Sequence, residues 1–198
     1  MSAIRKLIEG YEAFQGTDYT QMKDTFDELA KGQAPEVLLI TCSDSRINPE
    51  LILQYAPGDV FMIRNAGNIV PISADMSPAE MGTIEFAVSV LNVKHIIVCG
   101  HSDCGAVKGM LDPTKLEALP YLHDWILKSS TDFRIDEGAT LEAHIQQNIE
   151  NQLTHLRQYD FIDQRVQDNS LSLHAWMYNI GDCTIQAFSE SERQWLPL

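Results

Sequence analysis

Two short, continuous apolar runs constrain the fold of this 198-residue chain more than any other feature. Residues 36–41 read Glu-Val-Leu-Leu-Ile-Thr, and residues 94–99 read Lys-His-Ile-Ile-Val-Cys. Apolar runs of this length without polar alternation are typical of strands that are buried on both faces of a parallel sheet. Both runs are far shorter than the roughly 20 residues that a membrane-spanning helix needs. The sequence therefore predicts an α/β fold with a mainly parallel sheet and no membrane span.

Helical segments alternate with the strands. Apolar residues at helical spacing predict two helices within residues 2–32, an N-terminal arm that either covers its own domain or packs on a partner subunit. Pro49 is placed to begin a short helix ahead of a strand over residues 59–63. Ser77-Pro78-Ala79-Glu80 is a capping box that predicts a helix over residues 78–91. A long polar helix is predicted over residues 140–159.

The last third of the chain ends in an antiparallel hairpin. Residues 171–179 and 184–188 read as strands, and Gly181-Asp182 forms the turn between them. Because no long linker interrupts the chain, we expect one domain over residues 1–198. It comprises the arm (1–32), a core that carries the candidate site (33–110) and the C-terminal helices and hairpin (111–198).

Charge and cysteine content narrow the class of protein. The chain has 28 acidic and 14 Lys or Arg residues, a net charge of −14, and no basic cluster with which to bind nucleic acid or an anionic membrane. The four cysteines form no dense disulfide framework, and Glu9 and Glu12 stand where a signal peptide would be apolar. We therefore expect a cytoplasmic protein without nucleic-acid or membrane partners.

Two polar clusters directly follow the two apolar runs, Cys42-Ser-Asp-Ser-Arg46 and Gly100-His-Ser-Asp-Cys-Gly105. The carboxyl ends of parallel strands meet at one edge of the sheet, which would bring Cys42, His101 and Cys104 together. Two thiolates and one imidazole suit zinc, and three protein ligands leave the fourth position for water, as in catalytic zinc sites. The sequence thus predicts one zinc ion per chain.

Asp44 and Arg46 lie close to the first ligand and can form a bidentate pair. A carboxylate held by this guanidinium could accept a hydrogen bond from zinc-bound hydroxide and orient its lone pair toward an electrophile. If the pair opened, Asp44 could become the fourth zinc ligand and close the site.

Other interpretations have less support. A cysteine phosphatase would need arginine where the chain has Asn48, and no glycine-rich nucleotide motif is present. Each candidate ligand taken alone could be an inert buried cysteine or a hydrogen-bonded histidine. Cys99 could compete as a ligand, but its apolar strand favours an inert thiol. The remaining histidines, His155 among them, lack metal-ligand spacing.

On these two motifs the chain resembles the β-class carbonic anhydrases. The resemblance extends from the N-terminal helices to Trp176-Met-Tyr178 and implies a four-stranded, mostly parallel sheet and an obligate dimer that can pair into tetramers. It implies reversible hydration of carbon dioxide to bicarbonate and a proton through zinc-bound hydroxide. By the same resemblance, the zinc ligands are Cys42, His101 and Cys104. The catalytic dyad is Asp44 and Arg46.

The resemblance also implies a substrate pocket. Gln33 matches a glutamine that hydrogen-bonds bicarbonate across the dimer interface. Phe61, Ala66 and Phe86 match the apolar pocket for carbon dioxide, and Gly105 matches the backbone beside the metal.

Departures from the family pattern bear on regulation. Leu39 stands where regulated bacterial members have a tryptophan for inhibitory bicarbonate, although Arg64 and Tyr178 are present, so we expect the open form in which Asp44 pairs with Arg46. Phe86 and Val90 replace a tyrosine and a histidine of some plant members, which leaves the proton shuttle unassigned. Two other functions stay open, namely hydrolysis of carbonyl sulfide or carbon disulfide on the same site, and a noncatalytic zinc module that senses bicarbonate.

Overall fold

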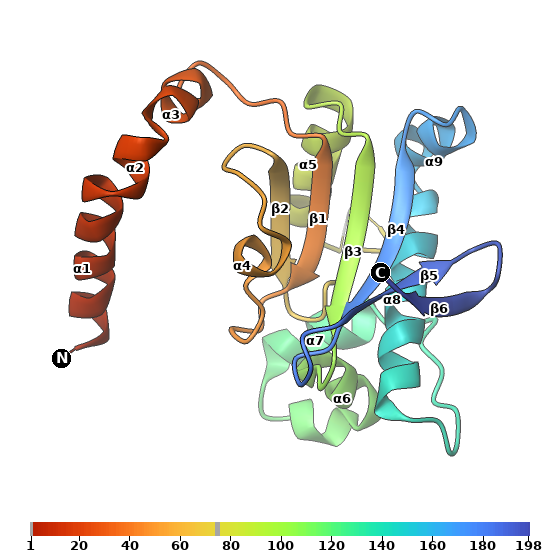
Figure 1. Cartoon of the computed structure of the whole chain (residues 1–198). Helices are drawn as coiled ribbons and strands as arrows, with labels where there is room; N and C mark the ends of the chain where they lie inside the picture. The colour runs from red at the N-terminus through yellow and green to blue at the C-terminus, as the bar shows by residue number, and fades with distance from the viewer. Residues whose placement is uncertain (1, 74–75) are drawn as a thin grey trace. The chain divides into compact units, whose positions relative to one another are not determined.

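The computed structural model describes residues 2–73 and 76–198 and divides into two compact units, Met1–Ala34 and Pro35–Leu198 (Figure 1). The first unit holds three helices among its described residues, one more than predicted, because the backbone leaves the helical region at Thr17 and again at Met22. The Ser2 hydroxyl caps the first helix by accepting a hydrogen bond from the Arg5 N–H at 3.3 Å. The helices are α1 (Ala3–Gly16), α2 (Asp18–Gln21) and α3 (Lys23–Leu29).

A six-stranded sheet runs through the described part of the second unit, in the order β2-β1-β3-β4-β5-β6 (Figure 1). The four strands β2, β1, β3 and β4 are parallel, as predicted, and β5 returns antiparallel to β4 as the predicted hairpin. The sheet has six strands where the resemblance implied four, because β5 joins it beside β4 and a short terminal strand, β6, pairs antiparallel with β5. The strands are β1 (Val37–Cys42), β2 (Val60–Asn65), β3 (His95–His101), β4 (Ser172–Tyr178), β5 (Ile185–Ser189) and β6 (Gln194–Pro197).

The core forms around β1 and β3, which supply the two apolar runs. Leu38 and Ile40 of β1 and Ile96 and Val98 of β3 are fully buried. Helix α8 (Leu141–Arg157) packs against β3 and β4 and lies behind them in Figure 1. Burial on both faces explains why these strands carry no polar alternation.

The predicted helix after Ser77 forms as two consecutive segments, an α-helix followed by a π-helix. It begins at Pro78 as α5 (Pro78–Glu85) and continues as a π-helix, η1 (Phe86–Val90), in which the Leu91 N–H donates to the Phe86 carbonyl at 3.0 Å. The capping box itself is not formed, because the Ser77 hydroxyl bonds to the Glu80 carboxylate instead of to a main-chain N–H.

The remaining helices connect the strands. Pro49 begins α4 as predicted, and the side chain of Asn48 caps it. Among the described residues no helix has the length and apolar character to cross a bilayer. The connecting helices are α4 (Pro49–Leu53), α6 (Gly105–Leu111), η2 (Pro113–Leu116), α7 (Pro120–Lys128) and α9 (Asp160–Gln167).

Candidate metal centre

The candidate ligands lie where the strand order reverses. The chain leaves β1 toward β2 on one side and leaves β3 toward β4 on the other, so the carboxyl ends of β1 and β3 flank a crevice of the kind that binds ligands in open α/β sheets. Cys42 is the last residue of β1 and His101 is the last residue of β3. Cys104 is the N-cap of α6. The sheet topology therefore brings the three residues to one place, as predicted.

The geometry of these three side chains fits a metal ion. The two sulfur atoms and one imidazole nitrogen lie within 4.8 Å of one another, and all three residues are buried. The Nδ1 atom of His101 is 2.8 Å from the Ser102 carbonyl oxygen, an acceptor only, so Nδ1 carries the proton. The lone pair is then on Nε2, which is buried and has no hydrogen-bond partner among the described residues. A buried, unpartnered acceptor beside two thiols suits zinc.

The surroundings favour the thiolate form of Cys42. A hydrogen bond with the Cys104 thiol lowers the pKa of Cys42 well below its ordinary value, and the Gly67 N–H, 3.5 Å from the Cys42 sulfur, acts in the same direction. The same contact between the two thiols raises the pKa of Cys104, so of the two it is Cys42 that favours the thiolate, the form of cysteine that binds a metal ion.

Asp44 and Arg46 form the expected bidentate pair. Arg46 Nε lies 3.0 Å from Asp44 Oδ1, and Nη2 lies 2.7 Å from Oδ2. This pairing holds the pKa of Asp44 far below its usual range. Asp44 Oδ2 is also 3.9 Å from His101 Nε2, so an ionised carboxylate stands next to the metal position.

Two further charged residues, Asp103 and Arg64, form hydrogen bonds with the Cys42–Arg46 segment. The sequence indicated this role for neither of them. Asp103 accepts a hydrogen bond from Arg46 Nη1 at 2.9 Å, and its only signal was its place between His101 and Cys104. Arg64 donates to the main-chain carbonyls of Cys42 at 3.0 Å and Asp44 at 2.8 Å. It thereby fixes the segment that carries the first ligand.

The predicted pocket residues separate into two places. Ala66 directly follows β2, and Gly105 begins α6 beside Cys104. Phe61 pairs in register with Leu38, whereas Asn65 pairs with Cys42, so Phe61 lies about 13 Å along the strand from the metal end.

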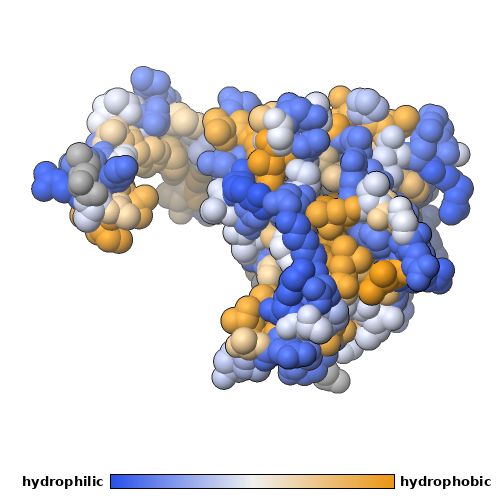
Figure 2. Space-filling view, turned by 90° about the horizontal axis from the view of Figure 1, so that it is seen from below, coloured by the Kyte–Doolittle hydropathy of each residue, from blue (hydrophilic) through white to orange (hydrophobic). Residues whose placement is uncertain are grey.

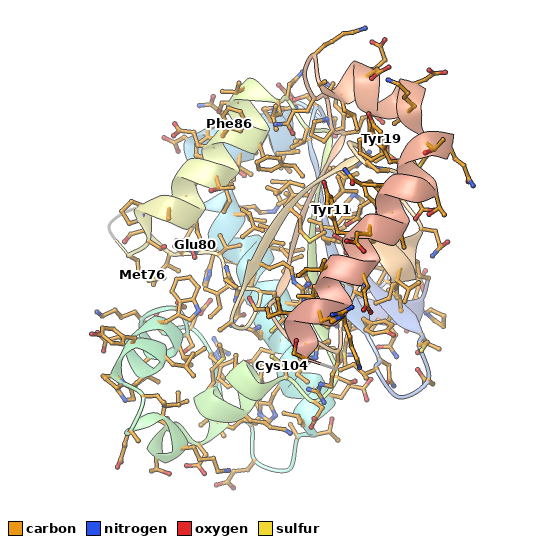
Figure 3. The ribbon with its side chains drawn as sticks, turned by 90° about the vertical axis from the view of Figure 1, so that its left-hand side faces the viewer. Tyr11, Tyr19, Met76, Glu80, Phe86 and Cys104 are labelled. Atoms are coloured by element: carbon orange, nitrogen blue, oxygen red, sulfur yellow. The ribbon has the colours of Figure 1, made fainter. Side chains whose placement is uncertain are left out.

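The rings of Phe61 and Phe86 lie 6.0 Å apart. Figure 3 shows Phe86 well apart from Cys104. This chain therefore does not bring the two rings to its own metal ligands. Gln33 belongs to the first unit.

The sequence and the fold were compared with those of known proteins. The sequence model of the family described as carbonic anhydrase matches residues 37–185. A carbonic anhydrase of Synechococcus elongatus is 38% identical over 186 residues, which cover 89% of this chain and 68% of the relative. A carbonic anhydrase of Pseudomonas aeruginosa is 37% identical over 202 residues, with 98% of this chain and 92% of the relative covered.

Solved structures agree with these relatives. The β-carbonic anhydrase CcaA superimposes with a TM-score of 0.92 at 35% identity, and all of both chains is covered. A tetrameric β-carbonic anhydrase of Sordaria macrospora gives a TM-score of 0.74 at 33% identity, with 94% of this chain and 96% of that chain covered.

Proposed function

The chain belongs to the β-class carbonic anhydrases, and we propose that it catalyses the reversible hydration of carbon dioxide to bicarbonate and a proton with one zinc ion held by Cys42, His101 and Cys104. The observation that carries the proposal is the buried cluster of two sulfurs and an unpartnered His101 Nε2 beside an ionised Asp44. Zinc, when bound, would lower the pKa of a water molecule to about 7 and so supply the nucleophile.

Asp44 and Arg46 have separate tasks in this proposal. The carboxylate of Asp44 accepts a hydrogen bond from the attacking water and so turns a lone pair toward carbon dioxide. Arg46, bound to both carboxylate oxygens, keeps Asp44 ionised and would hold it back from binding the zinc ion itself. Asp44 would close the site as a fourth ligand only if this pair opened. Leu39, in place of a tryptophan, also supports the open form.

We further propose that the working unit contains at least two copies of the chain. Phe61 and Phe86 lie away from the metal ligands of their own chain, so a role in binding carbon dioxide requires the site of a second copy. Gln33 would likewise bind bicarbonate at the site of the second copy. Ala66 and Gly105 would instead line the site of their own chain.

Helix α1 provides a surface for such an assembly. Ile4, Leu7 and Ile8 are 65%, 70% and 52% exposed, and Figure 2 shows hydrophobic residues on the first unit. Apolar side chains exposed in this way are typical of protein interfaces. A dimer, or a dimer of dimers, would cover them. A cytoplasmic location stays a prediction.

The test is stopped-flow carbon dioxide hydration, followed with a pH indicator on protein of known zinc content. We expect His101→Ala to lose zinc and activity together, because a two-cysteine site is incomplete. His123→Ala, a histidine outside the cluster, is the matched control and should keep both. Turnover by zinc-free His101→Ala would contradict the proposal. If zinc-loaded wild-type protein failed to hydrate carbon dioxide but hydrolysed carbonyl sulfide, the substrate assignment would be wrong.

A further inference from the structure

The loop of residues 66–71, which follows β2, is bound along its main chain by side chains from distant parts of the sequence. Trp125 Nε1 donates to the Ala66 carbonyl at 2.9 Å, and Asn148 Nδ2 donates to the Gly67 carbonyl at 3.2 Å. The Tyr159 hydroxyl donates to the Pro71 carbonyl at 2.7 Å. The loop thus depends on α7, α8 and the residues after α8 for its conformation.

A buried polar stripe on α8 makes most of these bonds. Asn148, Gln152 and His155 lie on one face of the helix, each with at most 2% of its surface exposed. Gln152 Oε1 accepts the Val70 N–H at 2.8 Å, and His155 Nδ1 lies 2.9 Å from the Val70 carbonyl oxygen. Buried polar side chains are costly unless they are hydrogen-bonded, and here the bonds go to the loop. An apolar stripe could pack the same space but could not hold the loop.

The bonds from Trp125 and Asn148 fix the two peptide groups that flank Gly67. The Ala66 carbonyl, held by Trp125, belongs to the same peptide group as the Gly67 N–H, which points at the Cys42 sulfur. Asn148 holds the next carbonyl. Gly67 has φ +87°, and glycine adopts many other conformations at little cost, so these peptide groups need external bonds to stay in place.

We propose that Trp125 and Asn148 are positioning residues for the metal centre, because they keep the Gly67 N–H directed at the sulfur of Cys42. The inference rests on the proposed role of Cys42 as a zinc ligand. An N–H donor to a ligand sulfur orients it and stabilises its negative charge, and loss of such an outer partner typically weakens metal binding about 10- to 100-fold. The sequence indicates no function for the segment around Trp125, and this proposal assigns it the positioning of the loop beside Cys42.

The test compares Trp125→Phe, which removes the indole N–H and keeps an aromatic ring, with Trp195→Phe. Trp195 donates its indole N–H to Glu150 at the same 2.9 Å but away from the loop, so it is a matched control. Asn148→Ala is compared in the same way with Asn151→Ala on the same helix. The readouts are the rate of zinc release to an excess of chelator and the thiolate-to-metal absorption band of the cobalt-substituted protein.

We expect Trp125→Phe and Asn148→Ala to release zinc about tenfold faster than wild type and to shift the cobalt band, and both controls to stay within about twofold. Release from Trp125→Phe at the rate of Trp195→Phe would overturn the inference while leaving the proposed function intact. Failure of the wild-type protein to bind zinc would instead overturn the proposed function and this inference together.

A measurement on wild-type protein covers the case in which the variants do not fold. Hydrogen exchange of the amides of Gly67 and Val70 is recorded with and without zinc. If the side chains of α7 and α8 position the loop, these amides stay protected in the metal-free protein. Free exchange after zinc removal would mean that the metal orders the loop, and the inference would be wrong.

Discussion

Replacement of Gly67 by alanine tests how tightly the loop is packed beside the metal centre. An added Cβ would lie 2.8 Å from the Cβ of Ala106, an atom that cannot rotate away because it is attached directly to the α6 backbone. The positive φ of +87° adds about 1–2 kcal/mol of backbone strain for any L-residue. The steric conflict adds about 1–3 kcal/mol, as is usual for overpacked positions. We therefore expect a loss of about 2–5 kcal/mol in unfolding free energy.

Two other glycines separate these contributions. Gly138 has a similar φ of +83° with no atom within 4 Å of an added Cβ, so Gly138→Ala should show the strain alone, about 1–2 kcal/mol. Gly82 lies within α5 with open space around it, and Gly82→Ala should stabilise the protein by about 0.5–1 kcal/mol.

The assay is urea unfolding of zinc-saturated protein, with thermal unfolding as a second measure. At about 2–4 °C per kcal/mol for a chain of this size, Gly67→Ala should lower the Tm by roughly 4–20 °C. It should also lose zinc more readily, because the Gly67 N–H moves away from Cys42. If Gly67→Ala proved no less stable than Gly138→Ala, the steric reasoning would be refuted.

Three other predictions concern charge and thiol chemistry. Arg46→Lys removes the bidentate bond to Asp44 and should lower carbon dioxide hydration about 10- to 100-fold with unchanged zinc content, and full activity would contradict the assigned role. Burial raises the pKa of the Cys99 thiol to about 12, whereas the pKa of this thiol in the unfolded chain is about 8.5. Above about pH 8.5 the unfolded chain loses this proton and the folded protein keeps it. The free energy of unfolding should therefore fall by about 1.4 kcal/mol per pH unit in that range. Urea unfolding between about pH 8 and 10 should show a shallower alkaline decline for Cys99→Ala than for wild type, and equal slopes would reject this origin. A thiol reagent at about pH 8 should modify exposed Cys183 rapidly and leave Cys99 unmodified in native zinc-loaded protein, and Cys183→Ser should remove the fast phase.

The sequence alone determined the features that depend on local pattern. Apolar runs of strand length predicted β1 and β3, because a strand buried on both faces has no polar alternation. The same pattern located the candidate metal centre, since residues that follow parallel strands must meet at one edge of the sheet. Cys42, His101 and Cys104 could therefore be grouped from their positions along the chain, and the structure brings their ligand atoms together.

Features that depend on partners distant in sequence required the tertiary structure. The polar composition of α8 predicted a helix, but a polar side chain that binds a buried carbonyl looks the same in sequence as one that faces water. Only the packed structure shows that His155, which lacks metal-ligand spacing, meets the main chain of Val70 and the carboxylate of Asp132. Asp103 was not singled out for the same reason, because its bond to Arg46 forms across two loops.

The placement of Phe61 illustrates the same limit at the site. Its apolar character suits a pocket for carbon dioxide, but only the register of β2 against β1 shows that it lies far along the strand from Cys42. The chemistry of a residue follows from its own side chain and is known from the sequence. Its neighbours in space depend on how the whole chain packs to reach its minimum in free energy. The sequence by itself therefore determined which groups can bind zinc, and the tertiary structure decided which other side chains hold those groups in place.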